Sequence, residues 1–163
     1  MKIYSLIFLI SLLFLPHPAF AGFWRECSVY ANPVTMEKIV YVESNGNPYA
    51  IDDDTMGRSY YYSDKYSAVS AARHLVDAGH NVDLGLAQIN ISNIRSYGLS
   101  ISDAFNPCYS VFYGSYILLQ GYNLALRRFK NVRVALFRAL EYYNSGQFFG
   151  DRIYAEKVWE ALN

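Results

Sequence analysis

The sequence predicts a single, mainly α-helical domain with a small β element near its middle. Apolar residues recur every three or four positions in several long stretches, which is the periodicity of an amphipathic helix. The stretch from Val82 to Ile91 instead alternates apolar residues with polar or small ones, as an extended segment does. No internal repeat, low-complexity segment or Pro/Ser-rich linker divides residues 22–163, so we expect one domain large enough to bury a core.

The first 21 residues have the layout of a cleaved secretory signal. Lys2 gives a positive start, an apolar run follows from Ile3 to Leu15, and Ala19-Phe20-Ala21 is a small-x-small cleavage site. The apolar run is short for a bilayer-spanning helix, although a membrane anchor is the alternative. Gly22 rather than a cysteine follows the predicted cut, so a lipid anchor is not indicated. We therefore expect an exported protein without a stable membrane anchor.

Capping residues mark the first helices. Asn32-Pro33 is a strong helix start, and this helix is expected to run to about Glu43. Residues 45–65 are rich in Asn, Gly and Asp and are predicted to form a loop. The Ala-rich stretch from Tyr66 to Ala78 predicts a second helix, which Gly79 ends.

Five helical elements are expected after the extended segment. A short helix is predicted from Asn93 to Tyr97, and a brief helical turn begins at Asp103. Long helices are predicted from Pro107 to about Phe129, from Val132 to Tyr143 and from Asp151 to Leu162. Together with the earlier helices, they make the domain mainly α.

Charge and cysteine content narrow the class of protein. The 14 Lys and Arg residues balance the 14 Asp and Glu residues, and no basic block or polybasic tail points to nucleic acid or an anionic membrane. Cys27 and Cys108 are an even pair in an exported chain, which indicates one disulfide; two free thiols are the alternative. Closing so long a loop would stabilise the fold by roughly 4 kcal/mol in the chain-entropy model.

Glu43 is an unusual residue because it ends an apolar stripe. At helical spacing it shares a face with Met36, Ile39 and Val40, and the helix stops within two residues. Burial would disfavour the charged carboxylate and raise its pKa, giving an acid able to protonate a glycosidic oxygen. A glutamate near a helix end that simply reaches solvent is the ordinary interpretation of the position alone.

Three short motifs follow one another along the chain. They are Glu43-Ser44 with Asn47-Pro48-Tyr49-Ala50, then Gly85-Leu86-Ala87-Gln88-Ile89-Asn90, then Tyr142-Tyr143-Asn144-Ser145-Gly146. In this order they resemble the lytic transglycosylases that share the goose-type lysozyme fold. The N-terminal cysteine and the runs 79–86 and 103–108 are similar to the transglycosylases of type IV secretion systems. The resemblance covers nearly all of residues 22–163 and implies a lysozyme-like catalytic domain.

The first two motifs carry roles that the resemblance implies. Glu43 would be the single catalytic acid and then the base. Ser44 would lie near the acetamido group of the sugar or support Glu43. Gln88 and Asn90 would present amides to glycan hydroxyls and N-acetyl groups; polar residues at a strand edge facing water are the plainer interpretation.

The third motif would complete the site. The resemblance implies that Tyr143 holds Glu43 or the substrate through its hydroxyl, and that Asn144 binds substrate or shapes the cleft. A core aromatic with a surface hydroxyl is the plainer interpretation of Tyr143. Tyr142 departs from the family, which usually has Ala there.

The implied substrate is peptidoglycan, cut at the β-1,4 bond between N-acetylmuramic acid and N-acetylglucosamine. Glu43 would protonate the leaving oxygen while the N-acetyl group of the substrate stabilises the oxocarbenium-like centre. The Glu43 carboxylate would then take the proton of the muramyl C6 hydroxyl, which closes a 1,6-anhydro ring. No metal or organic cofactor is needed. The implied partners are glycan strands and type IV secretion components, in the periplasm of a Gram-negative bacterium.

Two other functions stay open. A true hydrolase would need a second carboxylate, and Asp83, two residues before Gly85, is the best candidate; a structural Asp is the ordinary interpretation. A secretion-assembly protein could bind peptidoglycan without cutting it, although the presence of Glu43 argues against this.

Other polar and aromatic residues carry weaker signals. Asp52–Asp54 could bind a metal but are more often solvated loop charge. Tyr60–Tyr62 could stack on sugar rings but are more often packing residues. His74 and His80 are expected on the surface, on the Ala-rich helix and at its end.

Overall fold

The computed structural model describes residues 24–162, so the predicted signal sequence, residues 1–21, lies outside the described residues. Seven α-helices and four short strands make up this part of the chain, after a 3₁₀ turn at Arg25–Cys27. The helices are α1 (Pro33–Ser44), α2 (Lys65–Asp77), α3 (Ile91–Ser96), α4 (Ile101–Ala104), α5 (Pro107–Phe129), α6 (Val132–Ser145) and α7 (Arg152–Glu160). The strands are β1 (Ala50–Asp53), β2 (Arg58–Tyr61), β3 (Val82–Leu84) and β4 (Ile89–Asn90). The predicted mainly α domain with a small β element is confirmed.

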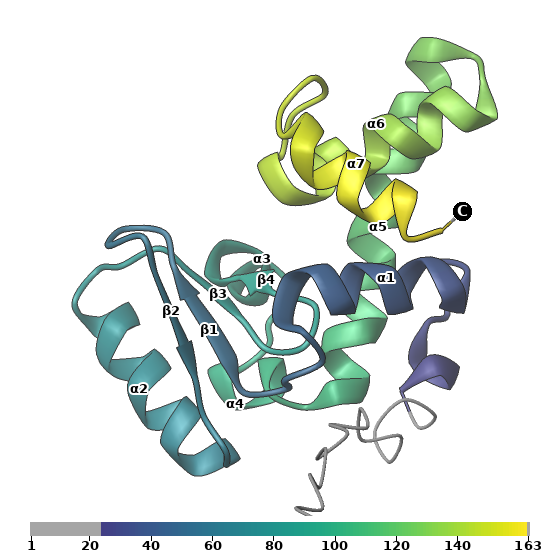
Figure 1. The fold of residues 1–163 in the computed structure, drawn as a ribbon. Helices are drawn as coiled ribbons and strands as arrows, with labels where there is room; N and C mark the ends of the chain where they lie inside the picture. Colours follow the sequence, from purple (N-terminus) through teal and green to yellow (C-terminus); the bar gives the residue numbers. More distant parts are fainter. Residues whose placement is uncertain (1–23, 163) are drawn as a thin grey trace, which may run out of the picture.

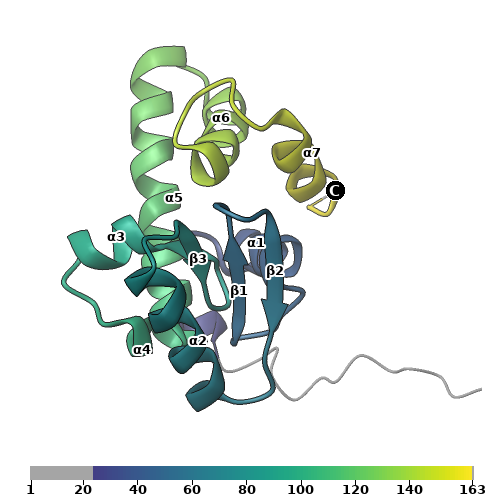
Figure 2. The ribbon, with the colours of Figure 1, turned by 90° about the vertical axis from the view of Figure 1, so that its left-hand side faces the viewer.

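The elements form two lobes joined by a central helix (Figures 1 and 2). The sheet lobe contains the four strands with α2, α3 and α4. The helical lobe contains α6 and α7, and both lobes contact α5. Helix α1 packs against α5 and α7, so its C-terminal end arrives between the two lobes.

The sheet is antiparallel, with strand order β2-β1-β3-β4. Ile51, Leu84 and Ile89 are direct partners across three strands and therefore share one face, which is buried. Asp52, Asp83 and Asn90 are likewise direct partners and share the opposite face. The register thus separates an apolar face from a polar face.

The predicted loop over residues 45–65 is wrong in its middle, because it contains the β1–β2 hairpin. Three consecutive Asp residues are poor strand formers, which hid β1 from the sequence. β1 pairs with β3 on the side opposite β2. The strand conformation of this segment therefore depends on tertiary contacts and not on its local sequence. The extended segment at residues 82–91 is also interrupted, since a tight turn over residues 85–88 separates β3 from β4.

Asparagine caps explain where the long helices begin. The side chain of Asn32 accepts a hydrogen bond from the Val34 N–H, and Asn106 accepts from Cys108 at the start of α5. Both caps precede a proline at the first helical position, as the sequence predicts. Asn90 caps α3 in the same way, so α3 starts two residues earlier than expected.

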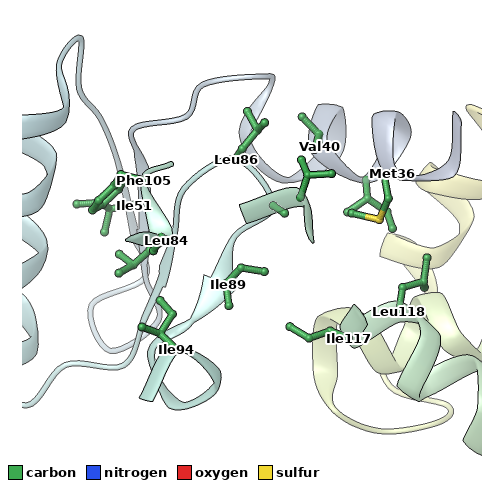
Figure 3. Packing of buried hydrophobic residues seen from close by; sticks show 14 of the residues in the cluster. Met36, Val40, Ile51, Leu84, Leu86, Ile89, Ile94, Phe105, Ile117 and Leu118 are labelled. Carbon is green, nitrogen blue, oxygen red and sulfur yellow. The ribbon is translucent and has the colours of Figure 1, made fainter. Parts of the chain in front are cut away.

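One continuous core runs beneath both lobes (Figure 3). Met36 and Val40 of α1 lie beside Leu86 and above Ile89 and Ile117 in this view. All five side chains are buried. The packing fixes the end of α1 against the β3–β4 turn.

A disulfide ties the N-terminal arm to the start of α5. Cys27 and Cys108 are bonded, with their Cα atoms 5.2 Å apart, which confirms the predicted pairing. Across residues 24–162, every helix is too short or too polar to cross a bilayer.

Candidate active site

A cleft of about 480 Å³ lies between the two lobes. Strands β3 and β4 and helix α3 supply one wall, and α5 and the end of α6 supply the other. The predicted site residues that line it are Glu43, Gln88, Asn90, Tyr143 and Asn144. Three motifs that are far apart in the sequence therefore meet in one hollow.

Glu43 reaches the cleft because α1 ends beside it. The residues before it on the same helix face, Met36, Ile39 and Val40, are buried in the core. Asn45 then takes the left-handed conformation, with φ of 50°, and its N–H bonds to the Tyr41 carbonyl, which closes the helix. The apolar stripe thus carries a partly buried carboxyl into the cleft.

The environment of Glu43 favours its protonated form. Burial raises the pKa of Glu43 to about 8, and the carboxylates of Asp83 and Asp52 add to the rise by repulsion. A hydrogen-bonding contact from Tyr154 acts in the opposite direction without cancelling it. Glu43 is therefore a carboxylic acid near neutral pH, ready to donate a proton.

The hydroxyl of Tyr154, a residue of α7, contacts the carboxyl of Glu43. Its ring is buried and lies parallel to the Tyr143 ring, with centroids 6.5 Å apart. The hydroxyl has no well-formed hydrogen bond among the described residues, yet its contact is close enough to lower the pKa of Glu43. A loose contact of this kind can tighten when Glu43 becomes a carboxylate.

The turn between β3 and β4 is braced from three sides. The Ser44 hydroxyl donates to the Leu86 carbonyl at 2.7 Å, and the Tyr143 hydroxyl donates to the Ala87 carbonyl at 2.7 Å. The Ser110 hydroxyl of α5 accepts from the Ala87 N–H at 2.9 Å. Helices α1, α5 and α6 therefore fix the position of the turn.

Gln88 sits at the end of this turn in a left-handed conformation, with φ of 45°. Its amide nitrogen donates to the carbonyls of Gly85 at 2.6 Å and Ala50 at 3.2 Å. The nitrogen is thus committed to closing the turn. The amide oxygen is the end of Gln88 that remains to meet a ligand in the cleft.

Asn90 lines the cleft with both ends of its amide already bonded. The oxygen accepts from the N–H of Ser92 at 2.9 Å and from the Ser92 hydroxyl at 2.7 Å, which caps α3. The nitrogen donates to the Asn81 side chain at 2.9 Å. Asn90 therefore shapes the wall rather than presenting free hydrogen-bonding groups.

Asp83 is a second carboxyl in the cleft. Burial raises its pKa to about 7, the neighbouring carboxylates of Asp54 and Asp52 add to this, and a hydrogen bond with Asn90 opposes it. The side chain shares the polar face of the sheet with Asp52, its direct cross-strand partner. Asp54 also lines the cleft with a raised pKa, so three such carboxyls lie in one cleft.

Comparison with known proteins identifies the family. Residues 25–159 match the family model described as Transglycosylase SLT domain. The chain belongs to this family. The mainly helical fold with a small sheet agrees with that assignment, and so do the three motifs that meet in the cleft.

Proteins from several bacteria are similar in sequence to this chain. It is 34% identical over 124 residues to "Protein virB1" of Rhizobium radiobacter, covering 76% of this chain and 52% of the relative. It is 33% identical over 132 residues to "Protein virB1" of Agrobacterium fabrum, covering 79% and 52%. "Type IV secretion system protein virB1" of Brucella abortus is 35% identical over 129 residues, covering 77% and 53%. The chain spans about half the length of these relatives. No solved structure gave a significant match.

Ser44 and Tyr143 both donate their hydroxyls to the turn between β3 and β4. Ser44 is buried beneath the cleft and binds the turn instead of lining the cavity. Tyr143 lines the cavity, and its hydroxyl donates a hydrogen bond to the Ala87 carbonyl. Both residues act on the turn that carries Gln88.

Tyr142, the departure from the family pattern, fits because α5 has a glycine opposite it. A Cβ at Gly121 would lie 2.9 Å from the Tyr142 ring. The ring also packs on Phe148 at 5.4 Å and lines the cleft. The larger side chain is therefore accommodated without closing the cavity.

Sequence reasoning missed Tyr154 in the SLT domain. Tyr154 falls within the helix predicted from Asp151 to Leu162, but it is one tyrosine among 16 in the chain. The available signal is its place directly before Ala155, which is buried.

The Asp52–Asp54 run does not converge on a common point. Asp52 accepts from Ser59 at 3.0 Å, and Asp54 accepts from Asn81 at 2.6 Å. Asp53 is buried on the opposite face and bonds to His80 at 2.8 Å; the His80 side chain keeps 23% of its surface exposed. Within residues 24–162, no cluster of three or more acidic, His or Cys side chains has a metal-binding arrangement.

Proposed function

We propose that this SLT domain is a lytic transglycosylase that cuts the β-1,4 bond between N-acetylmuramic acid and N-acetylglucosamine in peptidoglycan. The observation that carries the proposal is Glu43, a partly buried carboxyl with a pKa of about 8 in the cleft between the two lobes. Membership of the transglycosylase family supports the substrate class and the reaction type.

Glu43 would act twice. As a protonated acid it donates its proton to the glycosidic oxygen, and the bond to the anomeric carbon of the muramyl residue breaks. The N-acetyl carbonyl of the substrate stabilises the positive charge at that carbon. The Glu43 carboxylate then accepts the proton of the muramyl C6 hydroxyl, whose oxygen bonds to the anomeric carbon. Glu43 ends protonated, and no water is consumed.

The surrounding residues would hold Glu43 and the glycan in place. The Tyr154 hydroxyl supports the carboxylate formed after the first step, since a hydrogen bond favours the charged form. The amide oxygen of Gln88 is positioned to accept from a glycan hydroxyl or acetamido N–H. Asn144, exposed in the opposite wall, would contact the strand from α6.

A hydrolase that uses Asp83 is the second candidate, because Asp83 is also in the cleft. A general base opposite Glu43 would have to be ionised while Glu43 is protonated. Asp83 has a pKa of about 7, which leaves only a narrow pH range for that combination. The single-carboxyl mechanism works without this restriction, so we favour it.

We further propose that the protein serves a type IV secretion apparatus in the periplasm of a Gram-negative bacterium. The names of the Brucella relatives support the association with secretion. The disulfide and the signal-like sequence at residues 1–21 both support export to an oxidising compartment. Opening the wall locally would let the apparatus pass through it.

The test compares the wild type with Glu43→Gln on purified peptidoglycan sacculi. Glutamine keeps the shape but cannot donate or accept the proton, so activity should fall at least about 10²–10⁴-fold. Glu37→Gln, on the same helix but outside the cleft, is the matched control and should keep full activity. Equal activity of Glu43→Gln and the wild type would reject Glu43 as the acid, and an inactive wild type would favour a binding protein.

A further inference from the structure

Charge is unevenly distributed along the chain. From Ala50 to Asp103, the part that forms the sheet lobe, seven acidic residues outnumber four basic ones. From Ala104 to Leu140 the chain has five Arg and Lys residues and no Asp or Glu. A nearly neutral protein therefore has a negative sheet lobe and a positive stretch in α5 and α6.

The positive charge is concentrated where α5 meets α6. Arg127, Arg128, Lys130 and Arg133 are all exposed and fall within seven positions, in a segment we call the α5–α6 tip (127–134). Both ribbon views place this tip at the end of the molecule away from the sheet (Figures 1 and 2). In the described part of the chain, none of these four side chains pairs with a carboxylate.

Exposed apolar side chains lie in and beside the tip. Val132 is 66% exposed and Val134 is 42% exposed, both in the first turn of α6. Phe149, from the α6–α7 loop, is 58% exposed, and its ring centre lies 5.9 Å from the guanidinium of Arg128. Cationic and apolar groups therefore share one surface.

We propose that the α5–α6 tip docks reversibly on a membrane surface rich in anionic phospholipid. Basic side chains are attracted to such headgroups, and apolar side chains between them can enter the boundary with the acyl chains. A purely polyanionic partner, such as the carboxylates of the cell wall, would gain nothing from exposing Val132, Val134 and Phe149. The combination of both kinds of side chain favours a lipid surface.

The position of the tip leaves the cleft accessible. Helix α6 begins at Val132 in the tip and carries Asn144 in the cleft wall. Twelve residues at 1.5 Å each separate the two positions by about 18 Å. Docking therefore does not need to block the cleft, and the inference does not depend on the reaction that the cleft performs.

The experiment measures binding to vesicles by co-sedimentation at low salt. Vesicles of equimolar phosphatidylglycerol and phosphatidylcholine are compared with pure phosphatidylcholine. The tip variant is Arg127→Gln/Lys130→Asn/Arg133→Gln, in which Asn suits the left-handed backbone at 130 (φ 56°). The control variant, Arg58→Gln/Arg73→Gln/Arg95→Gln, removes the same charge from exposed positions of the sheet lobe.

The wild type should bind the anionic vesicles, and added salt should weaken this binding. Each basic residue near an anionic surface contributes about fivefold, so the tip variant should bind on the order of a hundredfold more weakly. The control variant should bind nearly as well as the wild type, and both variants should melt as the wild type does.

Equal losses in the two variants, or no binding to anionic vesicles, would overturn the proposal. A second arm tests the wall itself as the partner, using sacculi and the Glu43→Gln background to prevent digestion. If the tip variant loses binding to sacculi but not to vesicles, the partner is the wall and the membrane proposal is wrong.

Discussion

Replacing Glu43 with glutamine should stabilise the fold by an amount that depends on pH. In the folded chain the pKa of Glu43 is about 8, against 4.5 for an ordinary glutamate. The unfolded chain therefore releases this proton at lower pH than the folded chain does. The stability of the wild type is unaffected below about pH 4.5 and falls as pH rises towards 8.

The size of the effect follows from the two pKa values. Each unit corresponds to 1.36 kcal/mol, so ionisable Glu43 lowers the free energy of unfolding by up to about 3 kcal/mol at pH 7. Solvent in the cleft reaches one side of the carboxyl and reduces this figure. We expect Glu43→Gln to be more stable than the wild type by about 1–3 kcal/mol at pH 7.

Urea unfolding across the interval between about pH 4.5 and pH 8 tests this reasoning. The difference between Glu43→Gln and the wild type should be close to zero at the acidic end and should grow steadily with pH. Glu160→Gln, which removes an exposed carboxyl from α7, controls for loss of surface charge. A difference that does not change with pH would show that Glu43 is an ordinary solvated carboxylate.

Three further substitutions test the site and its support. Asp83→Asn should keep activity within about tenfold of the wild type once stability is matched, whereas a loss of several orders of magnitude in a folded variant would favour a second catalytic carboxyl. Gly114→Ala should lower stability by about 1–3 kcal/mol in urea unfolding, because its Cβ would lie 2.9 Å from the Tyr143 hydroxyl; unchanged stability would contradict this packing. Cys27→Ser/Cys108→Ser should unfold at lower temperature by calorimetry, with a loss of about 2–5 kcal/mol, and an unchanged melting temperature would argue against a structural disulfide.

The helical part of the fold could be predicted because its signals are local. Asn32-Pro33 and Asn106-Pro107 each place a cap and a proline where a helix begins, and both starts are correct. The position of Glu43 at the end of an apolar stripe could also be predicted, since helical spacing alone places it beside the core.

The rest depends on contacts between distant segments. The β1 strand is stabilised by pairing with β3, about 30 residues later, and its acidic residues give no local sign of it. The contact between Tyr154 and Glu43 joins α7 to α1, and no spacing rule connects two residues so far apart. The bonds that commit the Asn90 amide to Asn81 and Ser92 likewise appear only in the folded chain.

The charged α5–α6 tip could not be predicted from the sequence for a similar reason. Arg127, Arg128, Lys130 and Arg133 are interrupted by apolar and neutral residues, and the chain as a whole is balanced. The helix junction gathers them at one end of the molecule, while seven of the 14 acidic residues lie in the sheet lobe, between Asp52 and Asp103. Overall charge therefore gave no indication of this surface.

The chemistry of the product tests the central claim most directly. Purified sacculi are digested with the wild-type protein, and the released muropeptides are separated and weighed before and after borohydride reduction. If Glu43 serves as both acid and base, the muramyl ends should be 1,6-anhydro rings, one water lighter than hydrolysed ends and resistant to borohydride. Reducible ends one water heavier would show that water is the nucleophile, and would contradict the transglycosylase mechanism.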